Sequence, residues 1–241
     1  PGEPNPETVP VVCVPGDWNI KINEILPNPA GEDAEGEFIE LINTSSETVS
    51  IAGWGIAAGT SSWPGSVSYA FPGSSTIPAG GYTVVAGLGV EEADFYTDED
   101  NSFSLGNGSK NPDGVRLVDC TGVVQDTVLY GDPLDPVEDF ELDDDAGAAS
   151  MATMPGENFS VGRTPDGADT DNNEEDFLTN MPPTPGESNK VGGSGGSSVK
   201  GCGCGSDSPS DPESPAPEAS AVAGLVTALS LLIAMRRRDD D

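Results

Sequence analysis

Short apolar segments, interrupted repeatedly by Gly, Pro, Asn and Asp, limit the fold of this 241-residue chain more than any other feature. Each run has four to eight residues and is rich in Val, Ile, Tyr and Phe, as the strands of a β-sandwich are. The runs occupy residues 19–26, 37–43, 48–51, 54–57, 67–71, 82–86, 114–118, 123–130 and 159–162. No stretch between residues 17 and 187 carries the 3.6-residue apolar period of an amphipathic helix. The sequence therefore predicts one all-β domain over residues 17–187.

Changes in composition divide the rest of the chain. The predicted segments are a Pro-rich linker (1–16), an acidic surface insertion within the domain (132–158), a Gly/Ser/Pro linker (188–220), an uncharged apolar helix (221–235) and a charged tail (236–241). A flexible linker as long as 188–220 spans roughly 30 Å root mean square, enough to hold a domain clear of a surface. Because the chain begins without Met, we expect it to be the C-terminal part of a longer protein.

Charge and composition exclude several classes of function. The chain has 42 acidic and 9 basic residues, a formal net charge of −33, so its surface repels nucleic acids, which bind through Lys and Arg. It has no His, which excludes Ser-His-Asp hydrolases, Cys-His proteases and His-ligated zinc or haem sites. We therefore expect no catalysis by this chain and no nucleic-acid partner.

The apolar segment 221–235 predicts contact with a membrane. Fifteen helical residues cover about 22 Å, less than the roughly 30 Å of a hydrocarbon core, but the two preceding small residues extend the segment. Arg236, Arg237 and Arg238 follow it directly and favour the cytoplasmic side, which places the β domain outside the cell. The alternative is a helix buried in a core, although no nearby segment could cover it.

The C-terminal region also resembles the MYXO-CTERM sorting signal of myxobacterial surface proteins. The resemblance rests on Gly201-Cys202-Gly203-Cys204-Gly205, a polar spacer, the short apolar helix and the terminal arginines. It implies recognition by a sorting protease of the envelope, removal of the helix, and attachment to the cell surface through the region of Cys202 and Cys204. A plain tail anchor with incidental cysteines is the alternative.

The other two cysteines are candidates for a disulfide. Cys13 and Cys120 each lie beside a strand-like run, and an oxidising envelope would allow them to bridge. Closing a loop of this length would stabilise the fold by about 4–5 kcal/mol in the chain-entropy account.

An ordered series of motifs resembles the lamin tail domain family. The motifs are Ile22-Asn23-Glu24-Ile25, Gly36-Glu37-Phe38-Ile39-Glu40-Leu41-Ile42-Asn43, Val49-Ser50-Ile51-Ala52-Gly53-Trp54, Phe71-Pro72, Ile77-Pro78-Ala79-Gly80-Gly81-Tyr82, Ser104-Leu105-Gly106-Asn107-Gly108, Val115-Arg116-Leu117-Val118, Asp126-Thr127-Val128, Ser160-Val161-Gly162-Arg163 and Pro183-Thr184-Pro185-Gly186. Together they cover roughly residues 17–187. The resemblance implies an immunoglobulin-like β-sandwich.

Two groups of polar residues are candidate sites. Glu24, Glu37 and Glu40 lie in or beside strands, where acids are depleted. They either bond backbone amides at the sheet ends or point to solvent, or they converge as a cation site or catalytic carboxylate pair. A second group, Asp169, Asp171, Asn173 and Glu175, spaces oxygen ligands as a calcium loop does. This loop departs from the EF-hand pattern, which has Gly at its sixth position and Glu at its twelfth. Its alternative is an ordinary polar loop. No other cofactor is expected.

These observations predict a non-catalytic β-sandwich, anchored at the cell surface, that serves in adhesion or recognition of an unidentified surface ligand. Two alternatives remain. The chain is an accessory domain of an extracellular hydrolase whose catalytic part precedes Pro1, or it is a structural spacer stabilised by calcium.

Overall fold

The structure is a computed structural model, and the all-β prediction is confirmed. It describes residues 12–16, 19–60, 62–98, 103–107, 112–132 and 150–190, which all belong to the first of two units, residues 1–196. Within these residues the chain forms thirteen strands and two one-turn helices, α1 (Asp33–Gly36) and α2 (Asn173–Asp176).

Six strands form the first sheet, in the order β13-β12-β1-β2-β7-β8. Their bounds are β1 Ile20–Leu26, β2 Phe38–Asn43, β7 Tyr82–Ala86, β8 Phe95–Tyr96, β12 Ser160–Arg163 and β13 Phe177–Met181. The first strand of the domain thus lies between β2, its neighbour in sequence, and β12, which comes near the end of the domain. The middle of this sheet therefore combines strands from the beginning and the end of the domain.

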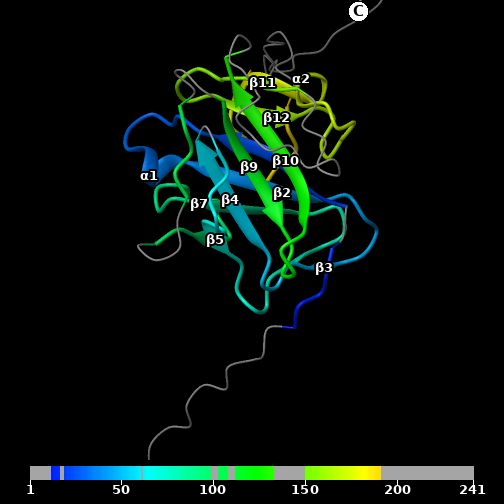
Figure 1. The fold of residues 1–241 in the computed structure, drawn as a ribbon. Coiled ribbons are helices and arrows are strands. Elements are labelled where there is room, and N and C mark those ends of the chain that lie inside the picture. The colour runs from blue at the N-terminus through cyan, green and yellow to red at the C-terminus, as the bar shows by residue number, and fades with distance from the viewer. Residues whose placement is uncertain are drawn as a thin grey trace, which may run out of the picture. The chain divides into compact units, whose positions relative to one another are not determined.

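Five strands form the second sheet, in the order β11-β10-β9-β4-β5. Their bounds are β4 Gly55–Thr60, β5 Tyr69–Ala70, β9 Asp113–Val118, β10 Val124–Gly131 and β11 Ala152–Thr153. A separate short pair joins β3 (Val49–Ser50) to β6 (Thr76–Ile77). Figure 1 shows β4, β9 and β10, in cyan to green, as one layer of the molecule with β2 in the other.

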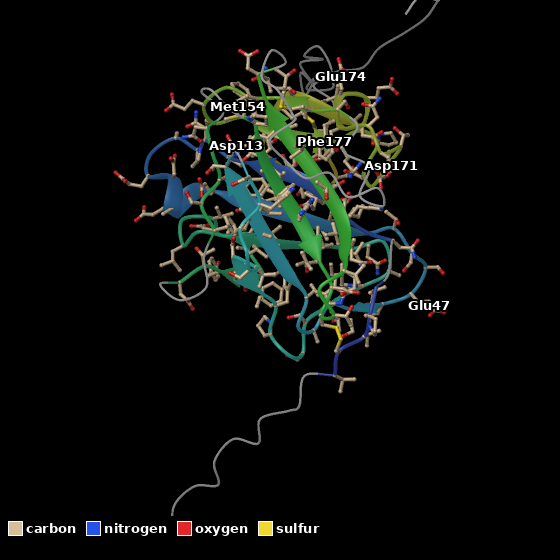
Figure 2. The ribbon with its side chains drawn as sticks, viewed as in Figure 1. Glu47, Asp113, Met154, Asp171, Glu174 and Phe177 are labelled. Atoms are coloured by element: carbon tan, nitrogen blue, oxygen red, sulfur yellow. A yellow bond between two sulfur atoms is a disulfide. The ribbon has the colours of Figure 1, made fainter. Side chains whose placement is uncertain are left out.

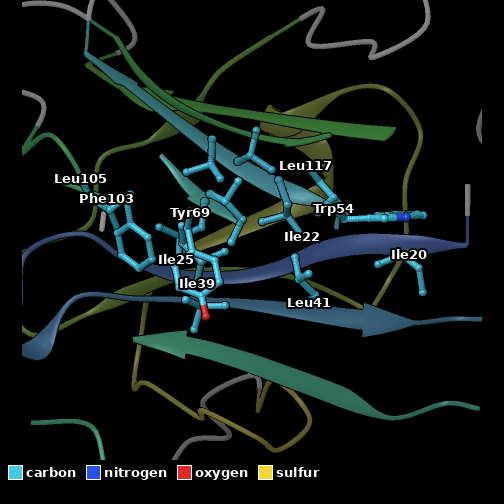
Figure 3. Packing of buried hydrophobic residues seen from close by; sticks show 14 of the residues in the cluster. Ile20, Ile22, Ile25, Ile39, Leu41, Trp54, Tyr69, Phe103, Leu105 and Leu117 are labelled. Atoms are coloured by element: carbon cyan, nitrogen blue, oxygen red, sulfur yellow. The ribbon is translucent and has the colours of Figure 1, made fainter. Parts of the chain in front are cut away.

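The core lies between the two sheets and contains alternate residues of their strands. Its members include Ile20, Ile22, Ile39 and Leu41 from the first sheet and Ile56, Val115, Leu117, Val128 and Tyr130 from the second. Figure 3 shows the Trp54 indole at one end of this layer and Phe103 and Leu105 at the other. Two facing sheets with one shared apolar layer are a β-sandwich, consistent with the immunoglobulin-like architecture.

A bulge in β1 interrupts the alternation of inward- and outward-facing residues, and it places two successive polar residues on the outer face of the first sheet. The pairing of β1 with β2 shifts register between Ile22 and Glu24, and the core resumes at Ile25. Asn23 and Glu24 therefore both face away from the core, since a bulge inserts one extra residue on the strand. Glu24 comes to lie directly opposite Glu40 of β2.

All nine predicted apolar runs contain a strand, and four strands were not predicted. The strands missed are β6, β8, β11 and β13. The first three have only two residues, too few for a period. In β13 the alternation is broken, because Thr179 and Asn180 are polar and Asn180 has φ of 59°.

The domain extends beyond the predicted boundaries at both ends. Residues 12–16 of the predicted N-terminal linker lie against the second sheet, and residues 188–190 of the predicted C-terminal linker lie against the first. Within the predicted insertion, β11 pairs in parallel with the end of β10. Neither helix in the described part of the chain is long and apolar enough to cross a bilayer. The predicted helix 221–235 lies outside the described residues.

Candidate functional site

The strand glutamates bind backbone amides of distant loops, as the structural alternative predicted. Both carboxylate oxygens of Glu37 accept the Leu105 N–H at 3.2 Å. Burial raises the pKa of Glu37 to about 7, and the charge of Asp33 adds to the shift. The described residues contain no group of three or more Asp, Glu or Cys side chains placed to hold a metal.

Glu24 and Glu40 hold the segment that follows β13. Glu24 accepts the Thr184 N–H at 3.1 Å and the hydroxyls of Thr184 and Ser160. Glu40 accepts the Gly186 N–H at 2.7 Å and the side-chain amide of Asn23 at 2.9 Å. Burial raises the pKa of Glu40 to about 8, with further increases from the charges of its acidic neighbours.

Asp166 completes this arrangement from the loop after β12. It accepts the Asn189 N–H at 3.0 Å, the Asn23 side-chain amide at 3.0 Å, the Tyr82 hydroxyl at 3.1 Å, and the Ser188 hydroxyl. We call residues 183–189, held by these carboxylates on the outer face of the first sheet, the C-terminal latch.

A buried arginine connects the two sheets. Arg163 is 0% exposed, and its guanidinium donates to both carboxylate oxygens of Asp126 at 3.0 and 3.1 Å. It also reaches Asp169 at 3.3 Å, Asp176 at 3.4 Å and the Ile22 carbonyl at 2.8 Å. The cation of β12 thereby binds a carboxylate of β10 across the sandwich.

One candidate ligand of the predicted calcium loop, Asp169, is paired with two cations. Asp169 binds Lys21 at 2.5 Å as well as Arg163. Burial alone would raise the pKa of Asp169, but the bond from Lys21 and the charge of Arg163 outweigh it and leave the pKa below its usual value. Of the other candidate ligands, Asp171 and Glu175 are exposed and Asn173 is buried. Calcium binding is untested, and the ion pairs of Asp169 favour the alternative of an ordinary polar loop.

A disulfide fixes the N-terminal segment, and it joins the two cysteines that the sequence analysis paired. Cys13 and Cys120 are bonded with their Cα atoms 5.6 Å apart, and the bond is visible as a yellow link in Figure 2. Nearby, the Trp54 indole N–H donates to the Val14 carbonyl at 3.1 Å, and the Gly16 N–H donates to Asp119 at 2.9 Å. The segment thus covers the indole end of the core. Cys202, Cys204 and Arg236–Arg238 lie outside the described residues.

A groove on the outer face of the second sheet is a candidate ligand site. Ile56 lies in the core and Ala58 packs against it, so Gly55, Ala57 and Gly59 face outward. A Cβ at Gly55 would lie 2.6 Å from Val67. The small residues of β4 therefore let the β4–β5 loop fold back onto the sheet.

Gly114 of the neighbouring strand β9 likewise leaves room for the β4–β5 loop to pack against the sheet. A Cβ there would lie 2.6 Å from the Trp63 ring, which also packs near buried Leu129. The Arg116 guanidinium carbon lies 3.9 Å from the centroid of the Trp63 ring, a cation–π contact. Trp63 and Arg116 together form one wall of the groove.

The groove has a volume of about 290 Å³, and its lining contains one cation and no acidic residue. The lining residues are Ala57, Trp63, Pro64, Gly65, Ser66, Val67, Arg116, Val118, Gly122 and Val124. Among these residues, Val67 is 42% exposed. Since pockets for small ligands begin near 300 Å³, this groove suits a single apolar side chain or ring.

Sequence reasoning missed this groove. The available signal was Trp63 itself, a large aromatic residue within the Gly-, Ser- and Pro-rich stretch 61–66. Its position on the sheet depends on glycines of two strands, which no local pattern connects.

Comparison with known families identifies residues 15–132 as a match to the family described as Lamin Tail Domain, which confirms the resemblance over that stretch. Among solved structures, the chain is similar to a DUF4876 family protein from Bacteroides thetaiotaomicron, with 13% identity over 69% of this chain and 72% of that chain and a TM-score of 0.45. No curated protein matches the chain. None of these comparisons bears on the MYXO-CTERM resemblance, which stays a prediction.

Proposed function

We propose that this chain is a non-catalytic recognition module on the outer side of the cell envelope, and that the groove beneath the β4–β5 loop is its binding site. The observation that carries the proposal is the acid-free apolar lining of this groove in a chain with a net charge of −33. Apolar surface that remains accessible on an otherwise charged domain is typical of an interaction site. The ligand would insert one apolar side chain or ring between Trp63 and Val67.

The arrangement of the buried carboxylates supports a role without catalysis. Glu24, Glu37 and Glu40 each accept a backbone N–H of another segment, and Asp126 is paired with Arg163. A carboxylate that serves as general acid or base must reach a substrate. These groups instead hold loops in place, and their replacement would affect folding first.

Two observations support display outside the cytoplasm. The disulfide between Cys13 and Cys120 is of a kind that persists in oxidising compartments. The sequence of residues 201–241 predicts a membrane partner and a sorting protease, with Cys202, Cys204 and Arg236–Arg238 as the residues involved. Protease treatment of intact cells tests this, because a displayed domain is degraded and a cytoplasmic one is protected.

Processing of the tail has a separate test. Sequencing the C-terminus of the mature protein should find the chain shortened within the region after residue 200. An intact Arg236–Arg238 would contradict sorting and leave a plain membrane anchor.

Matched substitutions test the groove. Val67→Glu places a charge in the groove, whereas Leu88→Glu makes the same kind of change at a residue that is 76% exposed and lies outside it. We expect Val67→Glu to weaken binding of the purified chain to envelopes of the producing cells at least tenfold, and Leu88→Glu to leave it unchanged. Thermal unfolding of both variants controls for stability. Equal binding by the two variants contradicts the assignment.

A further inference from the structure

The C-terminal latch is held by a row of backbone hydrogen bonds to carboxylates. The N–H groups of Thr184, Gly186 and Asn189 donate to Glu24, Glu40 and Asp166, respectively. The Asn189 side chain adds bonds to the carbonyls of Asn23 at 3.2 Å and Arg163 at 2.9 Å. This set of bonds fixes seven consecutive residues on the sheet without forming a strand.

The latch contributes nothing to the apolar core. Met181 is the last buried residue in the described part of the chain, and residues 182–190 are exposed or half-exposed. By contrast, β13 directly before it buries Phe177 and Met181. A segment held only by partly exposed polar bonds opens at a lower free energy than strands that share the core.

The latch also lies at the point where the predicted tether leaves the domain. Residues 191–220 follow it, rich in Gly, Ser and Pro, and lead to the predicted anchor. Any pull between the domain and a C-terminal anchor therefore acts on Lys190 first, then on the latch, and only afterwards on β13.

We propose that the latch is a releasable segment of the tether, which detaches under load and lengthens the connection to the surface while the sandwich stays folded. Residues 182–190, which are the latch with one residue on either side, measure about 30 Å when fully extended, and this length is the upper limit of the extension on release. The load that opens the latch in the cell rests on the proposed function, whereas the latch itself is a property of the purified chain. Rebinding after release restores the original bonds, so the device is reversible.

Pulling the full chain by its two ends tests release under load. We expect a first extension of at most about 30 Å at low force, reversible on relaxation, before the larger extension of the sheets. Asn189→Ala removes three side-chain bonds of the latch and should lower the force of the first event only. Asn107→Ala, which removes one exposed bond to Asp33, is the matched control and should change neither event.

Hydrogen exchange on the same protein gives an independent measurement. The amides of Thr184, Gly186 and Asn189 should exchange at least 100-fold faster than those of Ile39 and Leu41 in β2, and Asn189→Ala should accelerate only the former. Exchange of both groups at one rate, or a single rupture without an earlier extension, overturns the proposal. Because neither experiment depends on where the protein is located, a failure of surface display would be seen separately, in the protease treatment of cells.

Discussion

Arg163 shows how a single cation organises the interior of a very acidic chain. Its guanidinium is fully buried and donates to Asp126, Asp169 and Asp176, which lie on β10, in the loop after β12 and in α2. The Phe177 ring covers one face of the guanidinium, whose carbon lies 4.6 Å from the ring centroid. A planar fork of five donors suits this task, whereas Lys would offer only a point charge.

Replacement of this arginine should be among the most destabilising changes in the domain. Arg163→Met leaves Asp126 buried without its cation, a loss of about 3–5 kcal/mol in the free energy of unfolding. Lys190→Met, which removes an exposed pair with Glu187, should change the free energy of unfolding far less. Urea unfolding of both variants measures the difference. A near-neutral Arg163→Met would show that the buried network contributes little.

Glu40 should make the stability of the fold depend on pH near neutrality. Its pKa is about 8 in the folded chain and 4.5 when unperturbed, because burial and the charges of Glu24 and Asp166 outweigh the hydrogen bonds from Asn23 and Gly186. Tyr82 is its other titratable neighbour. Between these two values the folded chain holds a proton that the unfolded chain has released. Raising the pH through this window therefore lowers the free energy of unfolding.

The variant Glu40→Gln tests the assignment of this pH dependence. We expect the urea midpoint of the native chain to fall from pH 6 to pH 9, with Glu37, whose pKa is about 7, adding to the trend. Glu40→Gln should make the slope shallower, while Glu47→Gln, at an exposed residue, should keep it. An unchanged slope in Glu40→Gln would assign the effect to other groups.

At the scale of elements, the disulfide decides whether the N-terminal segment stays on the domain. The bond closes a loop of 107 residues, so its loss should destabilise the fold by about 4–5 kcal/mol in the entropic limit. We expect Cys13→Ser with Cys120→Ser to lower the melting temperature and to expose the Trp54 indole to quenchers. The pair Cys202→Ser and Cys204→Ser is the control and should leave both measurements unchanged. Identical melting of the two pairs would exclude a stabilising bond.

The loop 169–175 offers a prediction about metal removal. Because Asp169 already binds Lys21 and Arg163, a divalent cation would have to displace both. We expect neither millimolar calcium nor a chelator to change the melting temperature by more than a degree, and titration calorimetry to detect no heat of binding. A clear rise in melting temperature with calcium would restore the loop as a cation site.

Individual strands could be predicted where a short apolar run is bounded by turn-forming residues. β2, β7, β9 and β10 matched their apolar runs within about a residue or two. The roles of Glu24 and Glu40 could not be predicted from local sequence, because the amides they bind lie at residues 184 and 186, far along the chain. The groove depends likewise on Gly114 packing against Trp63 of another loop. Local periodicity carries no information about such pairings.

At the scale of the whole molecule, the stretch that matches the lamin tail family is not sufficient for the fold. That stretch ends at residue 132, whereas the first sheet needs β12 and β13 and the core needs Val161 and Phe177. We expect residues 12–132 alone to be insoluble or to unfold without a cooperative transition, since β1 loses a neighbour and Asp126 loses Arg163. Residues 12–190 should melt within a few degrees of the full chain. Circular dichroism melts of both fragments decide this, and a folded 12–132 would contradict it.

The position of β1 between β2 and β12 also has a consequence for synthesis. Glu24 pairs with Gly162, 138 positions later, so the sheet cannot close while the second half of the domain is still being translated. A growing chain of this kind therefore carries an unpaired edge on β1 until β12 emerges from the ribosome. The order of its strands thus delays closure of the first sheet until nearly the whole domain has been translated.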